Sequence, residues 1–445
     1  MVCQTKGSHP MNHKREITGW AMYDWANSAF STTVVTAFLG PYLAALIASR
    51  PGGTLPLRAY LIEPEAFYPL CVTVSVILQV LFLPLLGALA DLTNLKKRLL
   101  ILFATIGATA TILLGLVSSG DGVVAGGLLF ILANFSFGAA VVFYNAYLPD
   151  IAPPEAQDRI SSLGFAYGYV GGGLLLALNL ALFQLLADTA VAVRLSLASA
   201  GVWWLGFTWL YPKRRLVERQ TAVALPPGAN FLTHSIRQFA QTLRDMFCHH
   251  PRTLQFLIAY LIYNDGIMTV NTVAAIFAAS ELGMGPEQLV GIILMIQFMA
   301  ALGALFFNKV AGRIGAKWTV IITLFGWTGV LLYAYGWLTT PEQVWGWAAA
   351  EALVLGSSQA LSRSLFAKMA PTGQESAYFG LYEISERGTS WVGPLIFFLA
   401  VQLTGSARAA LLPLTAFFVI GAIILFFTDV RQAILDAGNE APIRV

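Results

Sequence analysis

The sequence has few charged residues for its length. Asp, Glu, Lys and Arg make up 11% of its 445 residues, whereas apolar residues make up 57%. A water-soluble chain of this size could not bury so much apolar surface. Apolar runs recur along the whole sequence, and each is about twenty residues or longer, enough to cross about 30 Å of hydrocarbon. The sequence therefore predicts an integral, multi-pass membrane protein whose solvent is the lipid bilayer.

Cysteine and histidine are also scarce, which argues against a disulfide framework and a metal site. The three cysteines are Cys3, Cys71 and Cys248, and none has a CxxC or Cys/His spacing. The five histidines all fall in segments expected to be cytoplasmic: His9, His13, His234, His249 and His250. The sequence contains no phosphate-binding loop and no serine with a general base in a known motif. We therefore expect no cofactor, no metal and no enzymatic activity.

The charge balance and the N-terminus exclude two further classes. The net charge of +3 is small, and no basic patch is interleaved with aromatic residues, so we expect no nucleic-acid partner. A polar stretch runs through Glu16 and a long apolar run follows, without the short hydrophobic region and cleavage site of a signal peptide. We therefore expect the first helix to be retained as a signal anchor.

Apolar runs bounded by charged or turn residues predict twelve transmembrane helices. Their approximate ranges are 17–48, 66–90, 98–119, 122–149, 160–187, 191–211, 252–280, 287–311, 317–338, 343–370, 376–403 and 407–428. Most Lys and Arg residues fall on one side of these spans, and four fall on the other: Arg50, Arg58, Arg194 and Arg408. By the positive-inside rule the richer side is cytoplasmic, and an even number of spans places both termini there.

One long polar segment, from Lys213 to about His250, divides the spans into two groups of six. We therefore expect an N-terminal six-helix half at 1–212, a cytoplasmic linker at 213–251, and a C-terminal six-helix half with a short tail at 252–445.

The linker has two open interpretations. From Asn230 to Phe247 its apolar residues recur at helical spacing, which is typical of an amphipathic helix on the inner leaflet. The alternative is a flexible linker, broken at Pro226, Pro227 and Gly228.

The two groups of spans resemble each other. Asp24 in span one and Asp265 in span seven each lie close to an Asn and an aromatic residue. The segment 87–98 after span two is matched by 308–317 after span eight. Internal repeats of this kind are the basis of many transporter folds. The expected fold class is therefore an all-α membrane protein built from two pseudo-symmetric six-helix halves.

Charges inside the spans are the best pointers to function, because an ionised side chain in hydrocarbon is costly. Glu383, Glu386 and Arg387 in span eleven are spaced i, i+3, i+4 and share one helical face. A rise of about 1.5 Å per residue places them near the bilayer midplane. A Glu383–Arg387 pair would leave Glu386 needing a partner or a proton. The group is either a proton or substrate-charge site or a structural ion network between helices.

Asp24, Asp265 and Arg363 have similar alternatives. Asp24 lies a turn or two inside the cytoplasmic boundary, where it could help to close an inner gate. Asp265 is deeper and stands next to Gly266, a weak point in a helix. Arg363 lies near the cytoplasmic end of span ten, where it could either snorkel toward lipid headgroups or pair across the cavity.

The loop between spans two and three resembles the signature of the major facilitator superfamily. It runs from Gly87-Ala88-Leu89-Ala90-Asp91 to Lys96-Lys97-Arg98, and Gly312-Arg313-Ile314-Gly315-Ala316-Lys317 is its second-half echo. Leu92 departs from the usual pattern, in which a basic residue is common. The resemblance implies a transporter fold, and it makes these residues candidates for a gating or conformational role: Gly87, Asp91, Lys96, Arg98, Gly312 and Arg313. Arg363 is a further candidate for this role, from its charge near the cytoplasmic end of span ten.

Longer motifs resemble, more specifically, the autophagy-related vacuole effluxer family and its bacterial relatives. They are WAMYDWANSAF at 20–30, FYNAYLPDI at 143–151 and SSLGFAYGYVGGG at 161–173. The resemblance implies a secondary transporter, with amino acids as the substrate class. Candidate residues for the substrate or proton site come from these motifs and from the charged spans: Asp24, Asn27, Asn145, Asp265, Glu383, Glu386 and Arg387.

Three function classes are considered for this chain: a secondary transporter working by alternating access, a membrane enzyme acting on a lipid substrate, and a non-transporting sensor with a transporter fold. Clusters of His, Asp or Ser at the membrane surface and a soluble output domain are not visible in the sequence, which favours the transporter. The expected partners are a small-molecule substrate, protons and the lipid bilayer. Short loops are typical of a prokaryotic chain, so we expect the protein in a bacterial cytoplasmic membrane. We also expect it to function as a monomer.

Overall fold

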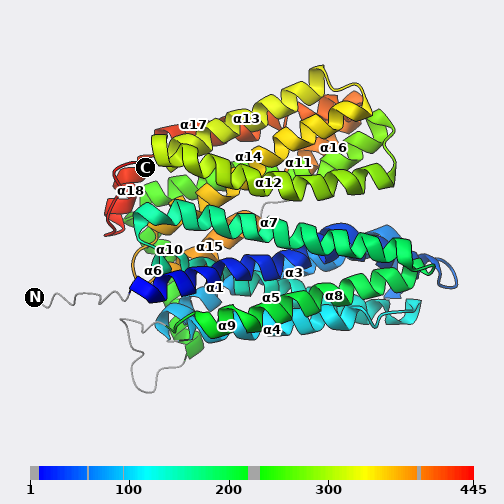
Figure 1. Ribbon diagram of the computed structural model, residues 1–445, viewed down its shortest axis with the longest axis horizontal. Coiled ribbons are helices and arrows are strands. Elements are labelled where there is room, and N and C mark those ends of the chain that lie inside the picture. Colours follow the sequence, from blue (N-terminus) through cyan, green and yellow to red (C-terminus); the bar gives the residue numbers. More distant parts are fainter. Residues whose placement is uncertain (1–9, 58–59, 94, 219–230, 388–391) are drawn as a thin grey trace, which may run out of the picture.

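The computed structural model describes residues 10–57, 60–93, 95–218, 231–387 and 392–445, and nearly all of them are helical (Figure 1). The long helices before the linker are α1 (Pro10–Ala29), α3 (Pro64–Leu92), α4 (Lys96–Leu114), α5 (Val123–Ala146), α7 (Pro154–Leu185) and α8 (Thr189–Leu210). Those after it are α11 (Pro251–Leu282), α12 (Pro286–Ile314), α13 (Ala316–Gly336), α14 (Pro341–Met369), α15 (Glu375–Arg387), α16 (Val392–Thr404) and α17 (Thr415–Phe427).

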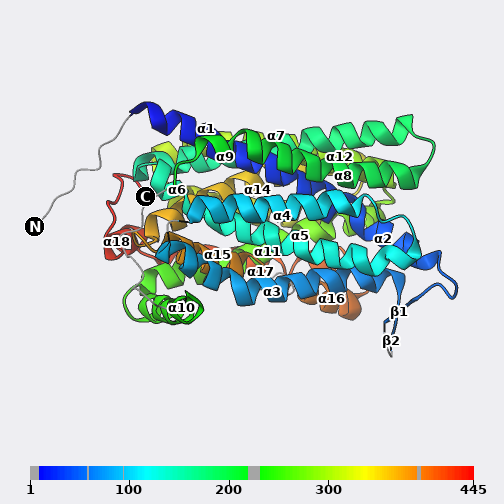
Figure 2. The same ribbon diagram turned by 90° about the horizontal axis from the view of Figure 1, so that it is seen from below.

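Shorter elements connect these helices. They are η1 (Phe30–Phe38), α2 (Leu39–Ala48), β1 (Leu55–Leu57), β2 (Tyr60–Ile62), η2 (Gly120–Gly122), α6 (Leu148–Ile151), α9 (Pro212–Arg215), α10 (Phe231–Cys248), η3 (Ala409–Leu411) and α18 (Val430–Asp436). The two strands form an antiparallel hairpin in which Leu55 pairs with Ile62. We call the end of the molecule that carries α10 and α18 the inner end, and the opposite end the outer end (Figures 1 and 2).

Ten candidate membrane spans occur in the described part of the chain, and they run along the long axis of the molecule (Figure 1). Helix α14 is not among these ten spans, but at 29 residues it is as long as α3, and it runs parallel to the long helices of its bundle. The predicted eleventh span contains α15 and α16, with 388–391 between them outside the described residues. The multi-pass helical fold is therefore confirmed, and the count of twelve, which needs α14 and the α15–α16 pair as spans, stays a prediction.

The helices before and after the linker gather into two bundles (Figure 1). Contacts on two sides join the bundles: α7 packs against α12 and α14, and α3 and α5 pack against α15. We refer to these bundles as the N-half and the C-half. The predicted boundaries of the halves, at 1–212 and 252–445, stay a prediction.

The first span is not a uniform α-helix, because α1 continues through the π-helix η1 into α2. Most residues of η1 are hydroxyl-bearing or β-branched. Ser and Thr hydroxyls compete with α-helical hydrogen bonding, and β-branched side chains have a lower helix propensity. Thr36 Oγ1, for example, donates to the carbonyl of Ser31 at 3.0 Å. The wide turn places Thr32 beside the C-half, where Gln297 Nε2 of α12 donates to its hydroxyl at 3.0 Å. Turns of this kind are frequent at functional sites.

The linker contains a helix, as one of the two interpretations predicted. This helix, α10, lies across the direction of the long helices and is seen nearly end-on in Figure 2. It packs against α3 of the N-half and against α11 and α15 of the C-half. Ile236 and Phe247 on its outer side are exposed apolar residues. The predicted break at Pro226, Pro227 and Gly228 lies outside the described residues.

Candidate functional site

Arg363 of α14 is the centre of a buried polar cluster that joins the two halves. Its guanidinium Nη1 lies 3.2 Å from Asp24 Oδ2 on α1 and donates to Asn145 Oδ1 on α5 at 3.3 Å. Its Nε and Nη2 donate to the hydroxyl and the carbonyl of Ser161 on α7, both at 2.9 Å. Arg363 is 3% exposed, so it pairs across the interface and the snorkelling alternative is wrong.

Aromatic rings surround this guanidinium. Its central carbon lies 4.2 Å from the Phe165 ring centre, 4.8 Å from that of Trp20 and 5.3 Å from that of Tyr144. The Trp20 and Tyr144 rings stack at 4.4 Å, and the Tyr144 hydroxyl donates to Asp24 Oδ2 at 2.6 Å. The faces of aromatic rings attract cations. The site therefore compensates the charge of Arg363 with a carboxylate and with π-electrons.

Asn145 carries the cluster onward to α15. Its amide nitrogen donates to Glu383 Oε1 at 3.0 Å while its oxygen accepts from Arg363. Glu383 Oε2 in turn lies 3.1 Å from Arg387 Nε, so the predicted i, i+4 pair is present. Glu383 is fully buried, whereas the Arg387 side chain is 18% exposed and lies over the Phe137 ring at 5.0 Å.

The charges in this cluster alternate along its length. Asp24, Arg363, Glu383 and Arg387 have formal charges that sum to zero, and Asn145 separates the two ion pairs. Removing one partner from such a buried pair leaves an uncompensated charge and is far more costly than removing both. These ion pairs can therefore hold the halves together in one state. In a state where the halves move apart, the charged groups need new partners or water. We call these five residues the central cluster.

The remaining predicted site residues, Asn27, Asp265 and Glu386, are not members of the central cluster. Glu386 is partly buried, and its backbone carbonyl accepts from Asn264 Nδ2 of α11 at 3.3 Å. Asn27 is buried on α1, and none of the described hydrogen bonds connects it to the central cluster. Asp265 is 2% exposed and accepts, through Oδ2, from the backbone N–H of Gly393 on α16 at 3.0 Å.

A second set of contacts closes the inner end. Asp91, the last acidic residue of α3, accepts hydrogen bonds from Ser376 N at 3.0 Å and Ala377 N at 2.7 Å, in the first turn of α15. A carboxylate at this place satisfies two of the orphan N–H groups of the helix and complements its dipole. Gly87 lies one turn earlier on α3, where a Cβ atom would overlap the Ser376 carbonyl. The predicted gating residues Gly87 and Asp91 thus lie in direct contact with the other half.

Lysine residues strengthen the same end. Lys96 Nζ lies 3.0 Å from Asp150 Oδ2 within the N-half and 4.0 Å from Glu375 Oε2 in the C-half. Lys368 Nζ of α14 lies 2.6 Å from Asp158 Oδ1 of α7, whose oxygen also accepts from Ser364 Oγ. With Asp91, these residues form what we call the inner latch.

Arg98, Gly312 and Arg313, also predicted as gating residues, do not contribute to the inner latch. Arg98 is exposed on α4. Gly312 and Arg313 lie in the last turn of α12, where their carbonyls accept from Arg444 Nη1 of the C-terminal segment at 3.2 and 2.8 Å. The second-half echo therefore contacts the chain's own tail, although its sequence resembles the first copy.

Sequence reasoning did not select several residues of the cluster and the latch as site candidates. Tyr144 and Ser161 lie inside quoted motifs, so a motif signal was present, but neither is charged. Asp158 and Lys368 are charged, yet their pairing joins segments that are 210 residues apart. Such a pair is invisible until the fold brings α7 and α14 together.

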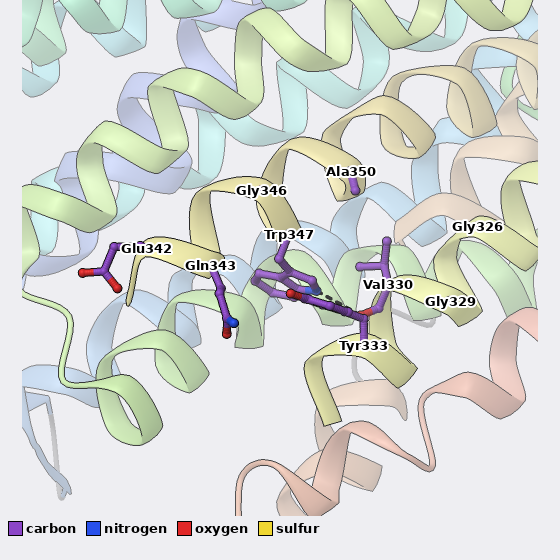
Figure 3. A pocket seen from close by; sticks show the side chains of 9 residues that line it. All are labelled: Gly326, Gly329, Val330, Tyr333, Glu342, Gln343, Gly346, Trp347 and Ala350. Atoms are coloured by element: carbon purple, nitrogen blue, oxygen red, sulfur yellow. Dashed lines mark hydrogen bonds between the residues drawn. The ribbon is translucent and has the colours of Figure 1, made fainter. Parts of the chain in front are cut away.

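A pocket of about 570 Å³ lies elsewhere, between α13 and α14 in the C-half. Figure 3 shows Trp347 at its middle, with Glu342 and Gln343 toward one end. None of the predicted site residues lines this pocket.

Comparison with known proteins settles the family. A model of the vacuole effluxer Atg22-like family matches residues 12–438. The chain belongs to this family. The MFS-type transporter YxiO of Bacillus subtilis is 30% identical over 430 residues, covering 94% of this chain and 97% of YxiO. Autophagy-related protein 22 of Kluyveromyces lactis is 26% identical, with 96% of each chain covered.

Solved structures confirm the major facilitator fold of this Atg22-like protein. The human organic anion transporter MFSD10 superposes with a TM-score of 0.69 at 16% identity, covering 94% of this chain and 100% of its own. FucP, in an outward conformation, superposes with a TM-score of 0.70 at 10% identity, covering 94% of this chain and 99% of its own. At these identities the likeness concerns the fold alone.

Proposed function

We propose that this Atg22-like protein is a secondary active transporter that moves a small solute by alternating access. The observation that carries the proposal is the central cluster, in which a buried arginine of the C-half pairs with an aspartate of the N-half. Alternating access requires the two halves to separate at one end while they close at the other. Ion pairs between the halves can break and re-form in such a cycle. A protein whose halves stay fixed would not need buried ion pairs between them, because packed apolar contacts would be enough.

The inner latch supports the same mechanism. Asp91 and Lys96 in the N-half contact the start of α15, and Asp158 contacts Lys368 in the C-half. These contacts favour the state that is closed at the inner end, and a solute must shift the population toward the other state to be carried across. In this proposal the gating residues are Gly87, Asp91, Lys96 and Arg363. Arg98, at the start of α4, and Gly312 and Arg313, at the end of α12, make no contact with the other half in this proposal.

The proposed substrate class is amino acids. The central cluster offers two carboxylates and two guanidinium groups, which suit the ammonium and carboxylate groups of a zwitterion. The name of the family, a vacuole effluxer, agrees with export of a small solute. Glu386, which lies on the same helical face as Glu383 and Arg387, is our candidate for a proton-coupling carboxylate.

The proposed setting is the cytoplasmic membrane of a bacterium, in keeping with the Bacillus relative, with a monomer as the working unit. Both termini and α10 are then cytoplasmic, by the distribution of Lys and Arg. Reporter fusions at residue 1, within 219–230 and at residue 445 test this orientation. A single fusion reporting from outside the cell would overturn it.

Transport by the purified protein in proteoliposomes tests the function directly. Uptake and efflux of radiolabelled amino acids should be measured with and without a pH gradient, beside empty liposomes. We expect exchange of at least one amino acid, and accumulation of it when the gradient is present. Exchange without any effect of the gradient would remove proton coupling, and no exchange of any amino acid would remove the proposed substrate class.

A further inference from the structure

Glu351 of α14 is a buried carboxyl group outside the central cluster. It is 1% exposed, and its Oε2 has no hydrogen-bond partner among the described residues. No described ion pair includes it either, unlike the buried Glu383 on α15. An ionised carboxylate in this position would be strongly destabilised, whereas the protonated form carries no charge.

The contacts of residues before and after Glu351 on α14 show which neighbouring helices its side of α14 faces. Trp347 Nε1 donates to the Val330 carbonyl of α13 at 3.0 Å, and its ring lies 6.3 Å from that of Phe277 on α11. Further along, the Ser362 and Tyr263 hydroxyls are 2.6 Å apart. Residues 347, 351 and 362 fall within about 60° of one another at about 100° per residue. Glu351 therefore lies on the side of α14 that packs against α11 and α13, inside the C-half.

Charged groups on the neighbouring helices lie closer to the inner end or to the outer end than Glu351 does, and each has a partner of its own. Asp265 of α11 accepts from Gly393 N. At the outer end, Arg408 lies 3.7 Å from Glu281 and over the Phe277 ring at 5.5 Å. Lys317 at the start of α13 donates to carbonyls of the α17 end. Between these levels the sequences of α11, α12, α13 and α17 contain no Asp, Glu, Lys, Arg or His at 266–280, 288–308, 318–336 and 415–427.

The pocket between α13 and α14 reaches the same part of α14 (Figure 3). Glu342 and Gln343, on the first turn of α14 at the outer end, line it at one extreme, and Ala350, the residue before Glu351, lines it at the other. Trp347 lines the pocket and stands one turn before Glu351. Gly329 and Gly346 in its wall have open space where a side chain would stand. The pocket therefore leads from a polar mouth to the neighbourhood of a buried carboxyl group.

We propose that Glu351 is a second proton-binding site, and that the pocket between α13 and α14 admits the proton from the outer end past Trp347. The step is the binding of one proton to one carboxylate oxygen, and release reverses it. As a coupling device this site rests on the proposed transport function, but proton binding itself does not.

Infrared spectroscopy of the purified protein in lipid tests proton binding without any transported solute. A protonated carboxyl group without a hydrogen bond gives a C=O stretching band at the high-frequency edge of the carboxylic-acid region, and the band shifts in D2O. We expect this band at neutral pH in the wild type, its loss in Glu351→Gln, and its return at a changed frequency in Glu351→Asp. Glu342→Gln, on the same helix but at its exposed end, is the matched control and should keep the band.

The route is tested by the rate at which the band shifts after a change from H2O to D2O. Gly346→Leu and Gly329→Leu fill the pocket where there is space for a side chain, and we expect both to slow the shift at least severalfold. Gly336→Leu also meets open space but lies outside the pocket, and it should leave the rate unchanged. A band that survives Glu351→Gln would overturn the site, and unchanged rates in both pocket variants would overturn the route.

The transport assay separates this inference from the proposed function. If Glu351 couples protons, Glu351→Gln should lower pH-driven accumulation of a radiolabelled amino acid while exchange continues. Loss of the infrared band with unchanged accumulation would leave a proton site without a coupling role. Absence of amino-acid exchange in the wild type would contradict the proposed substrate class and leave the infrared result standing.

Discussion

Arg363 and Asp24 form an ion pair between the halves, at 3.2 Å, although 339 residues separate them in the sequence. Substituting Arg363 with Gln leaves Asp24, whose side chain is 14% exposed, without its cation. We expect Arg363→Gln to destabilise the closed state by up to about 3–5 kcal/mol, because an uncompensated charge then stays in the interface. The thermal unfolding temperature of the purified protein measures this loss.

The double variant Asp24→Asn with Arg363→Gln is the control for that prediction. It removes both charges, so it should recover most of the unfolding temperature while transport stays impaired. If the double variant were as unstable as the sum of the two single variants, the pair would not be the cause of the loss.

Asp91→Asn should favour the state that is open at the inner end. The amide keeps one acceptor for the N–H groups of Ser376 and Ala377 but loses the charge that complements the α15 dipole. Hydrogen bonds to charged groups are worth about 1.5–3 kcal/mol, so the loss of one should raise the open-to-closed ratio by a factor of about 10 to 100. Alkylation of Ser162→Cys, in a chain whose own cysteines are replaced by Ala, reports the change because Ser162 is fully buried here. Equal labelling with Asp and with Asn at position 91 would rule out a latch role for this residue.

Two glycines, one in each of the repeated segments 87–98 and 308–317, should respond differently to the same substitution. At Gly87 a Cβ atom would overlap the Ser376 carbonyl, whereas at Gly312 it would meet open space. Gly87→Ala should therefore strain the inner latch by about 1–3 kcal/mol and increase labelling of the Ser162→Cys reporter. Gly312→Ala should leave labelling at the wild-type level. Similar labelling in the two variants would show that the close approach of α3 to α15 does not hold the inner end closed.

Glu383→Gln and Glu386→Gln should separate structural from coupling roles in span eleven. Glu383 binds both Asn145 and Arg387, so Glu383→Gln should lower accumulation and exchange together. Glu386→Gln should abolish pH-driven accumulation and leave exchange measurable, because exchange moves no net proton. Both are read in the proteoliposome assay. Full accumulation by Glu386→Gln would exclude this residue as a coupling carboxylate.

Sequence periodicity predicted much of the fold, because hydropathy and helix length are local properties. The i, i+4 pairing of Glu383 with Arg387 was predictable for the same reason, and it is present at 3.1 Å. The GxxxG step from Gly164 to Gly168 in the fifth span predicts close packing of this helix, and Gly168 lies where a Cβ atom would meet Ser28 Oγ of α1. Each of these inferences needs only one helix and its spacing.

The partners of Arg363 and Lys368 could not be predicted, because both pairings depend on how two bundles meet. Spacing along α14 leaves both snorkelling and cross-interface pairing possible for Arg363, and only the packing of α14 on α7 decides between them. The contacts of Gly312 and Arg313 were unpredictable for a related reason, because they involve the C-terminal segment, which is far from α12 in the sequence.

The bonds from Asp91 to Ser376 and Ala377 also make water a participant in gating. Once the halves part, the carboxylate and the two N–H groups can be satisfied only by solvent, so opening of the inner end has to be accompanied by hydration. The balance between the closed and open forms then depends on water activity. High concentrations of an excluded osmolyte should therefore favour the form in which the inner end is closed.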